Sequence, residues 1–192
     1  LKAKLKSHLF HTLIILLVCC NSVSYHQMAM ETPHKMIAIE DSLNNLGLTK
    51  KNQDALALAH KKVAITYLKE KNYKDAKAHF SNVLKYSTSD SIAQYNILMI
   101  DGHLLRQTGN KEKLWDAIEI YYKVQRLYPN NGAPYFFIGK AYQSLDKNDF
   151  DLILESYQKA LQLELPKPLK DEVEKEILSL LTRKKKLKDF WK

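Results

Sequence analysis

Apolar side chains recur in one five-position pattern at three places along the chain. Such side chains lie on one face of a helix when intervals of three or four residues separate them. A single copy would indicate only a surface helix, whereas three copies predict a repeated structural unit. The positions are Tyr73, Ala76, Phe80, Val83 and Tyr86; Leu114, Ala117, Tyr121, Val124 and Leu127; and Phe150, Ile153, Tyr157, Ala160 and Leu163.

Another apolar helical segment precedes each copy and carries a small residue, which is Ala64, Gly102 or Gly139. Antiparallel helices approach closely only where the side chains between them are small. Strands have little support, because β-branched and aromatic residues do not gather into alternating runs bounded by turn residues. The sequence therefore predicts an all-α fold with three helix–turn–helix units, at residues 52–89, 90–131 and 132–166.

These units resemble the tetratricopeptide repeat, a helical hairpin of about 34 residues. The resemblance covers residues 52–166 and implies a right-handed superhelical stack of antiparallel hairpins, a TPR-like solenoid with one concave side. Thr88, Ile153 and Asp101 depart from the family pattern. The matching residues are Val63, Ala64, Tyr67, Tyr73, Ala76 and Phe80; Gly102, Leu105, Gly109, Ala117, Tyr121, Val124 and Pro129; and Tyr135, Ile138, Gly139, Tyr142, Phe150, Tyr157, Ala160 and Pro166.

Helical patterns also flank the three units and predict capping helices that shield the ends of the stack. Residues 25–51 are expected to form an N-terminal helix and linker, closed by Gly47 as a C-cap. Residues 167–192 are expected to form a capping helix with a basic tail. The apolar positions are Met36, Ile37, Ile39, Leu43 and Leu46 at one end, and Leu169, Val173, Ile177, Leu180 and Leu181, continued by Leu187 and Trp191, at the other.

Residues 1–24 have the layout of an export signal. Three lysines precede a stretch from Leu9 to Cys20 that is apolar apart from two residues. That length suits a secretory signal and falls short of the about 20 residues that a spanning helix needs. The alternatives are a signal cleaved after Ser24, a bacterial lipoprotein signal with lipidation at Cys19 or Cys20, and an uncut anchor, and the residues favour the first two. We therefore expect an exported protein, periplasmic or membrane-anchored in the bacterial cell envelope, or secreted.

The formal net charge of +9 is concentrated at the two ends of the chain. Residues 1–24 carry +3, and residues 183–192 carry six Lys or Arg against Asp189, which leaves +1 for the rest. A nearly neutral body gives no reason to expect nucleic acid as a partner.

No motif for catalysis or metal binding is present in the sequence. The five histidines outside the N-terminal segment lack the four-residue spacing of a helical zinc site, and the glycines form neither a phosphate loop nor a dinucleotide fingerprint. Both cysteines lie in the N-terminal segment, so the body has no disulfide. The sequence predicts a noncatalytic protein with no metal and no cofactor.

The resemblance implies that the first helices of the three units bind a peptide or partner protein. Four cationic side chains beside Met99 and Phe136 would suit an acidic or carboxylate-ended peptide. The predicted function is a noncatalytic interaction scaffold of the cell envelope, and the alternative is a membrane-surface adaptor that acts through the basic C-terminal helix. The groove positions are Lys61, Ile65 and Lys69; Asn96, Met99, His103 and Arg106; and Phe136, Lys140 and Gln143.

Overall fold

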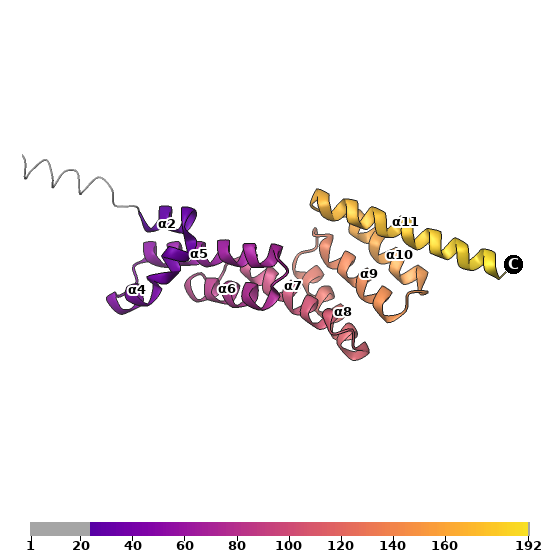
Figure 1. The fold of residues 1–192 in the computed structure, drawn as a ribbon, viewed down its shortest axis with the longest axis horizontal. Helices are drawn as coiled ribbons and strands as arrows, with labels where there is room; N and C mark the ends of the chain where they lie inside the picture. Colours follow the sequence, from indigo (N-terminus) through magenta and orange to yellow (C-terminus); the bar gives the residue numbers. More distant parts are fainter. Residues whose placement is uncertain (1–23, 192) are drawn as a thin grey trace, which may run out of the picture.

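The structure, a computed structural model, describes residues 24–191 as α-helices joined by short turns (Figure 1). The one sheet-like pairing within these residues is an isolated bridge between Asn131 and Glu164. The predicted all-α fold is confirmed. The helices are α2 (Tyr25–Glu31), α3 (Pro33–Ala38), α4 (Glu40–Leu46), α5 (Lys50–Lys69), α6 (Tyr73–Tyr86), α7 (Ser91–Gln107), α8 (Lys111–Leu127), α9 (Ala133–Leu145), α10 (Phe150–Leu161) and α11 (Lys167–Phe190).

Successive helices pair as hairpins, and the hairpins follow one another along the long axis of the molecule (Figure 1). Hairpin 1 consists of α5 and α6, hairpin 2 of α7 and α8, and hairpin 3 of α9 and α10. Neighbouring hairpins join where α6 packs on α7 and where α8 packs on α9. The chain therefore forms the stacked, TPR-like helical fold that the resemblance implies.

The small residues of α7 and α9 are in direct contact with tyrosines of the second helix in each hairpin. A Cβ atom added at Gly102 would lie 2.4 Å from Cε1 of Tyr121, and one added at Gly139 would lie 2.4 Å from Cε1 of Tyr157. Both tyrosine side chains are fully buried. The aromatic ring fills the space that the absent side chain leaves, which explains the pairing of small and aromatic positions in the sequence pattern.

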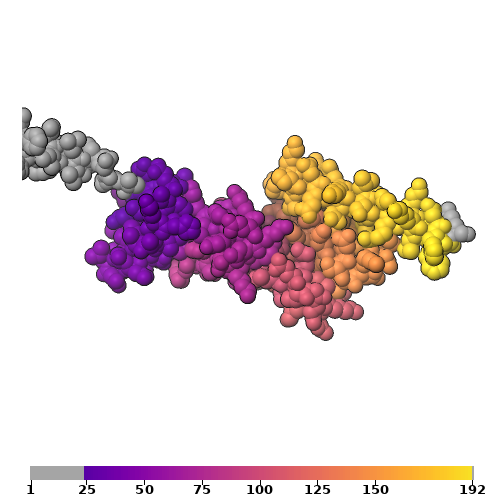
Figure 2. Space-filling view, viewed as in Figure 1, coloured from indigo at the N-terminus to yellow at the C-terminus, as the bar shows by residue number. Residues whose placement is uncertain are grey.

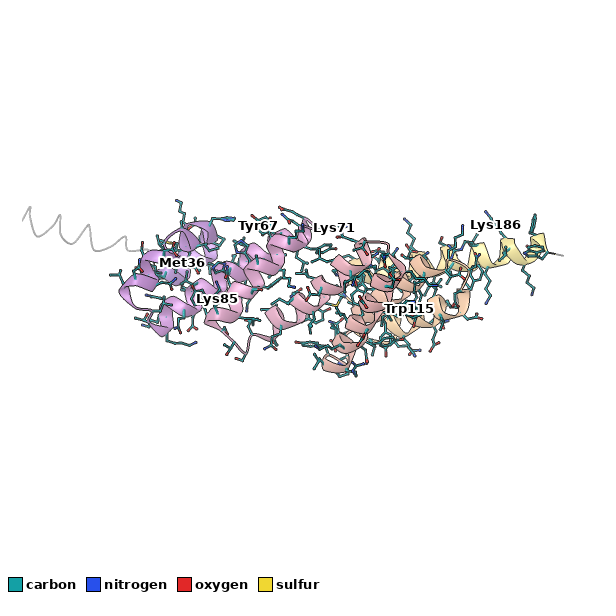
Figure 3. The ribbon with its side chains drawn as sticks, turned by 90° about the horizontal axis from the view of Figure 1, so that it is seen from below. Met36, Tyr67, Lys71, Lys85, Trp115 and Lys186 are labelled. Atoms are coloured by element: carbon teal, nitrogen blue, oxygen red, sulfur yellow. The ribbon has the colours of Figure 1, made fainter. Side chains whose placement is uncertain are left out.

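In hairpin 1, the turn after the first helix contains a residue other than glycine in a left-handed conformation. Lys71 has φ of 59°, a left-handed conformation that most often belongs to glycine. Its N–H donates to the carbonyl of Leu68, and the N–H of Asn72 donates to the carbonyl of Tyr67, so the last carbonyls of α5 are satisfied by the turn. This turn places the Lys71 side chain beyond the end of α5 (Figure 3).

The N-terminal region differs from the single helix expected there, because it forms three short helices. Pro33 begins α3, and the residue before a proline is pushed out of the helical region, so α2 ends before Thr32. α2 and α3 both pack on α5, and Met36 of α3 is fully buried in the core between them. Gly47 is the C-cap of α4, at φ of 88°.

α11 covers hairpin 3 by packing on α10, with Val173 and Leu180 fully buried. The sequence pattern placed Leu181 in the buried stripe, but the structure shows it 44% exposed on another side of the helix. Within residues 24–191, no helix is both long and apolar enough to cross a bilayer. The expected export signal, with Cys19 and Cys20, lies outside the described residues.

Candidate functional site

A pocket of about 270 Å³ opens where the first helices of the three hairpins converge. It brings together four of the predicted groove residues, from α5 and α7, and adds residues that the sequence did not single out. The lining residues are Leu68, Lys69, Lys71, Tyr73, Tyr95, Asn96, Met99, His103, Ala133 and Phe137.

Three larger hollows lie elsewhere on the surface, two of about 460 Å³ and one of about 420 Å³. One is lined by α11 alone, and a second by residues of α6, α7 and α8 with Lys123 as its one charged group. The third lies where the first turns of α2 and α5 meet. The smaller pocket is the better candidate, because it combines two cations, aromatic walls and a buried imidazole from elements of all three hairpins.

The cations of the pocket are Lys69, at the end of α5, and Lys71, in the following turn. Both side chains are exposed, and among residues 24–191 neither ammonium group forms an ion pair within the protein. Two unpaired ammonium groups at one rim can hold an anionic group of a ligand through charge-assisted hydrogen bonds.

The polar group inside the pocket is His103, which is buried among aromatic rings. Its Nδ1 atom lies 2.8 Å from the hydroxyl of Tyr121, and its ring contacts Phe137 edge-on with centroids 4.3 Å apart. Burial, aided by the charge of Arg106, lowers the pKa of His103 to about 3. Burial also raises the pKa of Tyr121, so the phenol keeps its proton and can donate it to the neutral imidazole.

Phe136 is a core residue rather than the groove residue expected from the sequence. It is 1% exposed and packs against Tyr157 of α10, with ring centroids 5.6 Å apart. Its neighbour Phe137 lines the pocket instead. Adjacent residues of a helix point about 100° apart. The predicted groove position was one residue too early in α9, and it therefore selected the core side chain Phe136 in place of the pocket side chain Phe137.

Lys61 and Ile65, the other predicted groove residues of α5, are used within the fold. Lys61 forms an ion pair with Asp90, the residue that also caps α7 by accepting a hydrogen bond from the N–H of Ala93. Burial alone would raise the pKa of Asp90, but the hydrogen bonds from Lys61 and Ala93 outweigh it and lower that pKa. Ile65 packs partly buried against the core of hairpin 1. Lys61 therefore joins two hairpins and does not offer its charge to a ligand.

The predicted groove residues of hairpin 3 face the capping helix. Nζ of Lys140 lies 3.0 Å from Glu176 of α11, and the amide of Gln143 lies 3.5 Å from the same carboxylate. Arg106, near the end of α7, lies over the ring of Phe137 at 5.9 Å. Of the four predicted cations, only Lys69 lines the pocket, and Lys71 is the cation that the sequence pattern missed because it lies in a turn.

A second polar cluster lies at the other end of hairpin 1. Glu40 of α4 accepts hydrogen bonds from the Tyr86 hydroxyl and from Nε2 of His60, and Nδ1 of His60 lies 2.8 Å from Nδ1 of His79. Burial alone would raise the pKa of Glu40, but the bonds from Tyr86 and His60 outweigh it, so the carboxyl pKa is lowered. Burial lowers the pKa of His79.

This cluster links the N-terminal region to hairpin 1, and its members satisfy one another. Glu40 accepts from Nε2 of His60, and in the contact between the two Nδ1 atoms one imidazole donates and the other accepts. Across residues 24–191, no three His, Cys, Asp or Glu side chains gather in a way that could hold a metal ion. We assign the cluster a structural role.

Comparison with known proteins does not assign the chain to a family. No protein-family model matches the chain, and no curated protein matches it. One solved structure that it matches is MamA 41-end from Desulfovibrio magneticus RS-1, at 15% sequence identity and a TM-score of 0.41, over 83% of this chain and 96% of that chain. A similarity of this level does not identify a ligand, so the function must be inferred from the pocket.

Proposed function

We propose that this protein is a noncatalytic interaction scaffold that binds an extended peptide segment of a partner protein across α5, α7 and α9. The observation that carries the proposal is the pocket, in which the unpaired Lys69 and Lys71 lie beside the apolar walls of Met99 and Phe137. Charged and apolar groups side by side suit a peptide that carries a carboxylate next to an apolar side chain.

The size of the pocket supports a peptide over a cofactor. Its volume of about 270 Å³ is below the roughly 300–1,000 Å³ of typical small-molecule sites. A peptide needs only a shallow recess for one anchoring side chain, because the rest of its backbone lies along the surface. The carboxylate would contact Lys69 and Lys71, and the apolar side chain would lie against Phe137.

The cell envelope is the location that we propose for this scaffold. The proposal rests on the hydrophobic N-terminal segment with its preceding lysines, which is typical of an export or lipoprotein signal. Mass analysis of the mature N-terminus would distinguish cleavage after Ser24 from lipidation at Cys19 or Cys20.

A peptide library tests the pocket directly. Random synthetic nonapeptides would be presented to the protein once with a free C-terminal carboxylate and once amidated, and the binders would be titrated by fluorescence polarisation. We expect acid-rich or carboxylate-dependent binders whose affinity falls at least about tenfold in Lys69→Ala/Lys71→Ala, since each charge-assisted hydrogen bond contributes about 1.5–3 kcal/mol. Lys111→Ala/Lys170→Ala removes two exposed lysines that do not line the pocket and serves as the matched control. Absence of binders, or equal affinity in both double variants, would contradict the proposed function.

A further inference from the structure

The apolar stripe of α11 continues beyond the surface on which the helix packs. Val173 and Leu180 are fully buried against hairpin 3. Seven and eleven residues after Leu180, on the same face of the helix, Leu187 and Trp191 are 39% and 78% exposed. Figure 2 shows this end of α11, in yellow, extending past the orange surface of α9 and α10.

The last hydrogen bonds and the last ion pair that α11 makes with hairpin 3 come from Arg183 and Lys184. Arg183 donates to the carbonyl of Lys147 and lies over the ring of Phe150 at 5.4 Å, and Lys184 forms a 2.8 Å ion pair with Asp151. From residue 185 to residue 191, the structure has no side-chain hydrogen bond or ion pair to the rest of the described chain. These residues therefore form a helical extension beyond the last polar contacts of α11.

The extension ends in an exposed aromatic pair. Phe190 and Trp191 are each 78% exposed, and their rings meet edge-on with centroids 5.4 Å apart. Two large aromatic side chains held together at a helix end, and in contact with water, are costly to leave uncovered.

Lysines surround this apolar end. Lys185, Lys186 and Lys188 are exposed and point to the other sides of the helix, and Asp189 is the one acidic residue of the segment. Figure 3 shows Lys186 on the free part of α11. The extension is thus amphipathic, with an apolar stripe of Leu187, Phe190 and Trp191 and a cationic remainder.

We propose that the extension of α11, residues 185–191, docks on an anionic lipid surface. The apolar stripe would enter the boundary between headgroups and acyl chains, and the lysines would contact lipid phosphates. The positive charge of the extension argues against a second copy of this chain as the partner that covers the apolar stripe. Two such extensions would bring six lysines together, and these would repel one another. Trp and Phe beside lysines match the composition of helices that lie in a membrane interface.

This docking goes beyond the proposed peptide function, because it would fix where the pocket is held. The extension lies at one end of the stack, and the pocket lies between hairpins, so a ligand could occupy the pocket while α11 touches a membrane. The two functions use different residues and can fail separately.

The emission of Trp191 in the full chain tests the proposal, and Trp115→Phe removes the other tryptophan. The probes are vesicles with brominated acyl chains, either phosphatidylcholine alone or a seven-to-three mixture with phosphatidylglycerol. Bromine quenches only a tryptophan that enters the acyl region, so the signal reports on the extension whatever the N-terminal segment does. We expect quenching and a blue shift with the anionic vesicles and little change with the neutral ones.

Matched charge variants then separate the lysines from general electrostatics. Lys185→Gln/Lys186→Gln/Lys188→Gln should weaken the anionic-vesicle titration on the order of 100-fold, since each lysine near such a surface contributes about 1 kcal/mol. Lys51→Gln/Lys74→Gln/Lys111→Gln, with the same charge change, should titrate like the parent. Absence of Trp191 quenching, equal quenching with neutral vesicles, or equal loss in both triple variants would overturn the proposal. A Trp191-dependent dimer in sedimentation velocity would also overturn it, because a second copy would then cover the stripe.

Discussion

The carboxylate of Glu176 lies 3.0 Å from Nζ of Lys140, and this ion pair joins the capping helix α11 to α9. The same carboxylate is within 3.5 Å of the amide of Gln143, which in turn accepts a hydrogen bond from the Tyr157 hydroxyl. The face of hairpin 3 that would line a longer groove is therefore occupied by the protein itself. A ligand has the surface of α5 and α7 and the adjoining edge of α9.

A double-mutant cycle on Glu176→Ala and Lys140→Ala measures what this pair contributes. Both side chains are about one quarter exposed, and we expect a coupling free energy of about 0.5–1 kcal/mol, typical of partly solvated ion pairs. Urea unfolding at low salt gives the coupling, and 1 M salt should reduce it through screening. A coupling energy of zero at low salt would mean that the two side chains do not interact in solution.

Gly102→Ala and Gly139→Ala should each lower the free energy of unfolding, although alanine is the better helix former. The new Cβ would lie 2.4 Å from a ring carbon of Tyr121 or Tyr157, and the overpacking should cost about 1–3 kcal/mol. This loss exceeds the gain of at most about 1 kcal/mol in helix propensity.

Gln158→Ala, at an exposed position of α10, is the matched control for those glycine variants. It should leave the urea midpoint nearly unchanged or raise it slightly. If the glycine variants raise the midpoint as well, the tyrosines can move away, and the close approach of the two helices does not limit stability.

Lys71→Gly should raise the free energy of unfolding by about 0.5–1 kcal/mol, because glycine adopts the left-handed conformation of this turn without strain. Lys69→Gly is its natural control, since Lys69 is the last residue of α5, where glycine relieves no left-handed strain and should cost up to about 1 kcal/mol. Both variants remove a cation from the pocket. Equal effects of the two variants on the urea midpoint would show that the turn carries no strain.

Acid should destabilise the protein through His103. In the unfolded chain this imidazole takes up a proton below its ordinary pKa of about 6.5, whereas in the folded chain its pKa is about 3. Between these pH values the unfolded state binds more protons, so stability falls as the pH falls. From pH 7 to pH 5 the loss from this one group is about 2 kcal/mol.

His103→Gln isolates that contribution. Glutamine does not titrate, so the difference in unfolding free energy between pH 7 and pH 5 should be smaller in the variant than in the wild type. His79 and Glu40, whose pKa values are also lowered, remain in both proteins and cancel in the comparison. An unchanged pH dependence would show that His103 takes up its proton while folded.

The helix hairpins could be predicted from the sequence because their signal is periodic. Ala64, Gly102 and Gly139 mark where two helices meet, and an aromatic position that fills the space follows 16 to 19 residues later in each unit. Repetition reinforces a weak local pattern, since three units carry it independently. The break of the N-terminal region before Pro33 was also readable in principle, from the conformational restriction that proline places on its neighbour.

The pocket was predictable only in part, because its composition depends on contacts between units. The family pattern placed Lys69, Asn96, Met99 and His103 on one surface, and these residues line the pocket. It could not show that Asp90 pairs with Lys61 or that Glu176 pairs with Lys140, since both acids come from a following element. Lys71 was missed because a turn residue lies outside any helical periodicity.

Three ion pairs, Lys61 with Asp90, Lys77 with Asp101 and Lys140 with Glu176, each connect one unit of the stack to the next. The packing contacts likewise run mainly between neighbours in the chain order. Such an array can bend as a whole, because a small rotation at each junction between units adds up along its length. The pocket lies across two of these junctions, so a ligand that draws α5 and α9 together would bend the whole molecule and change the separation of its two ends.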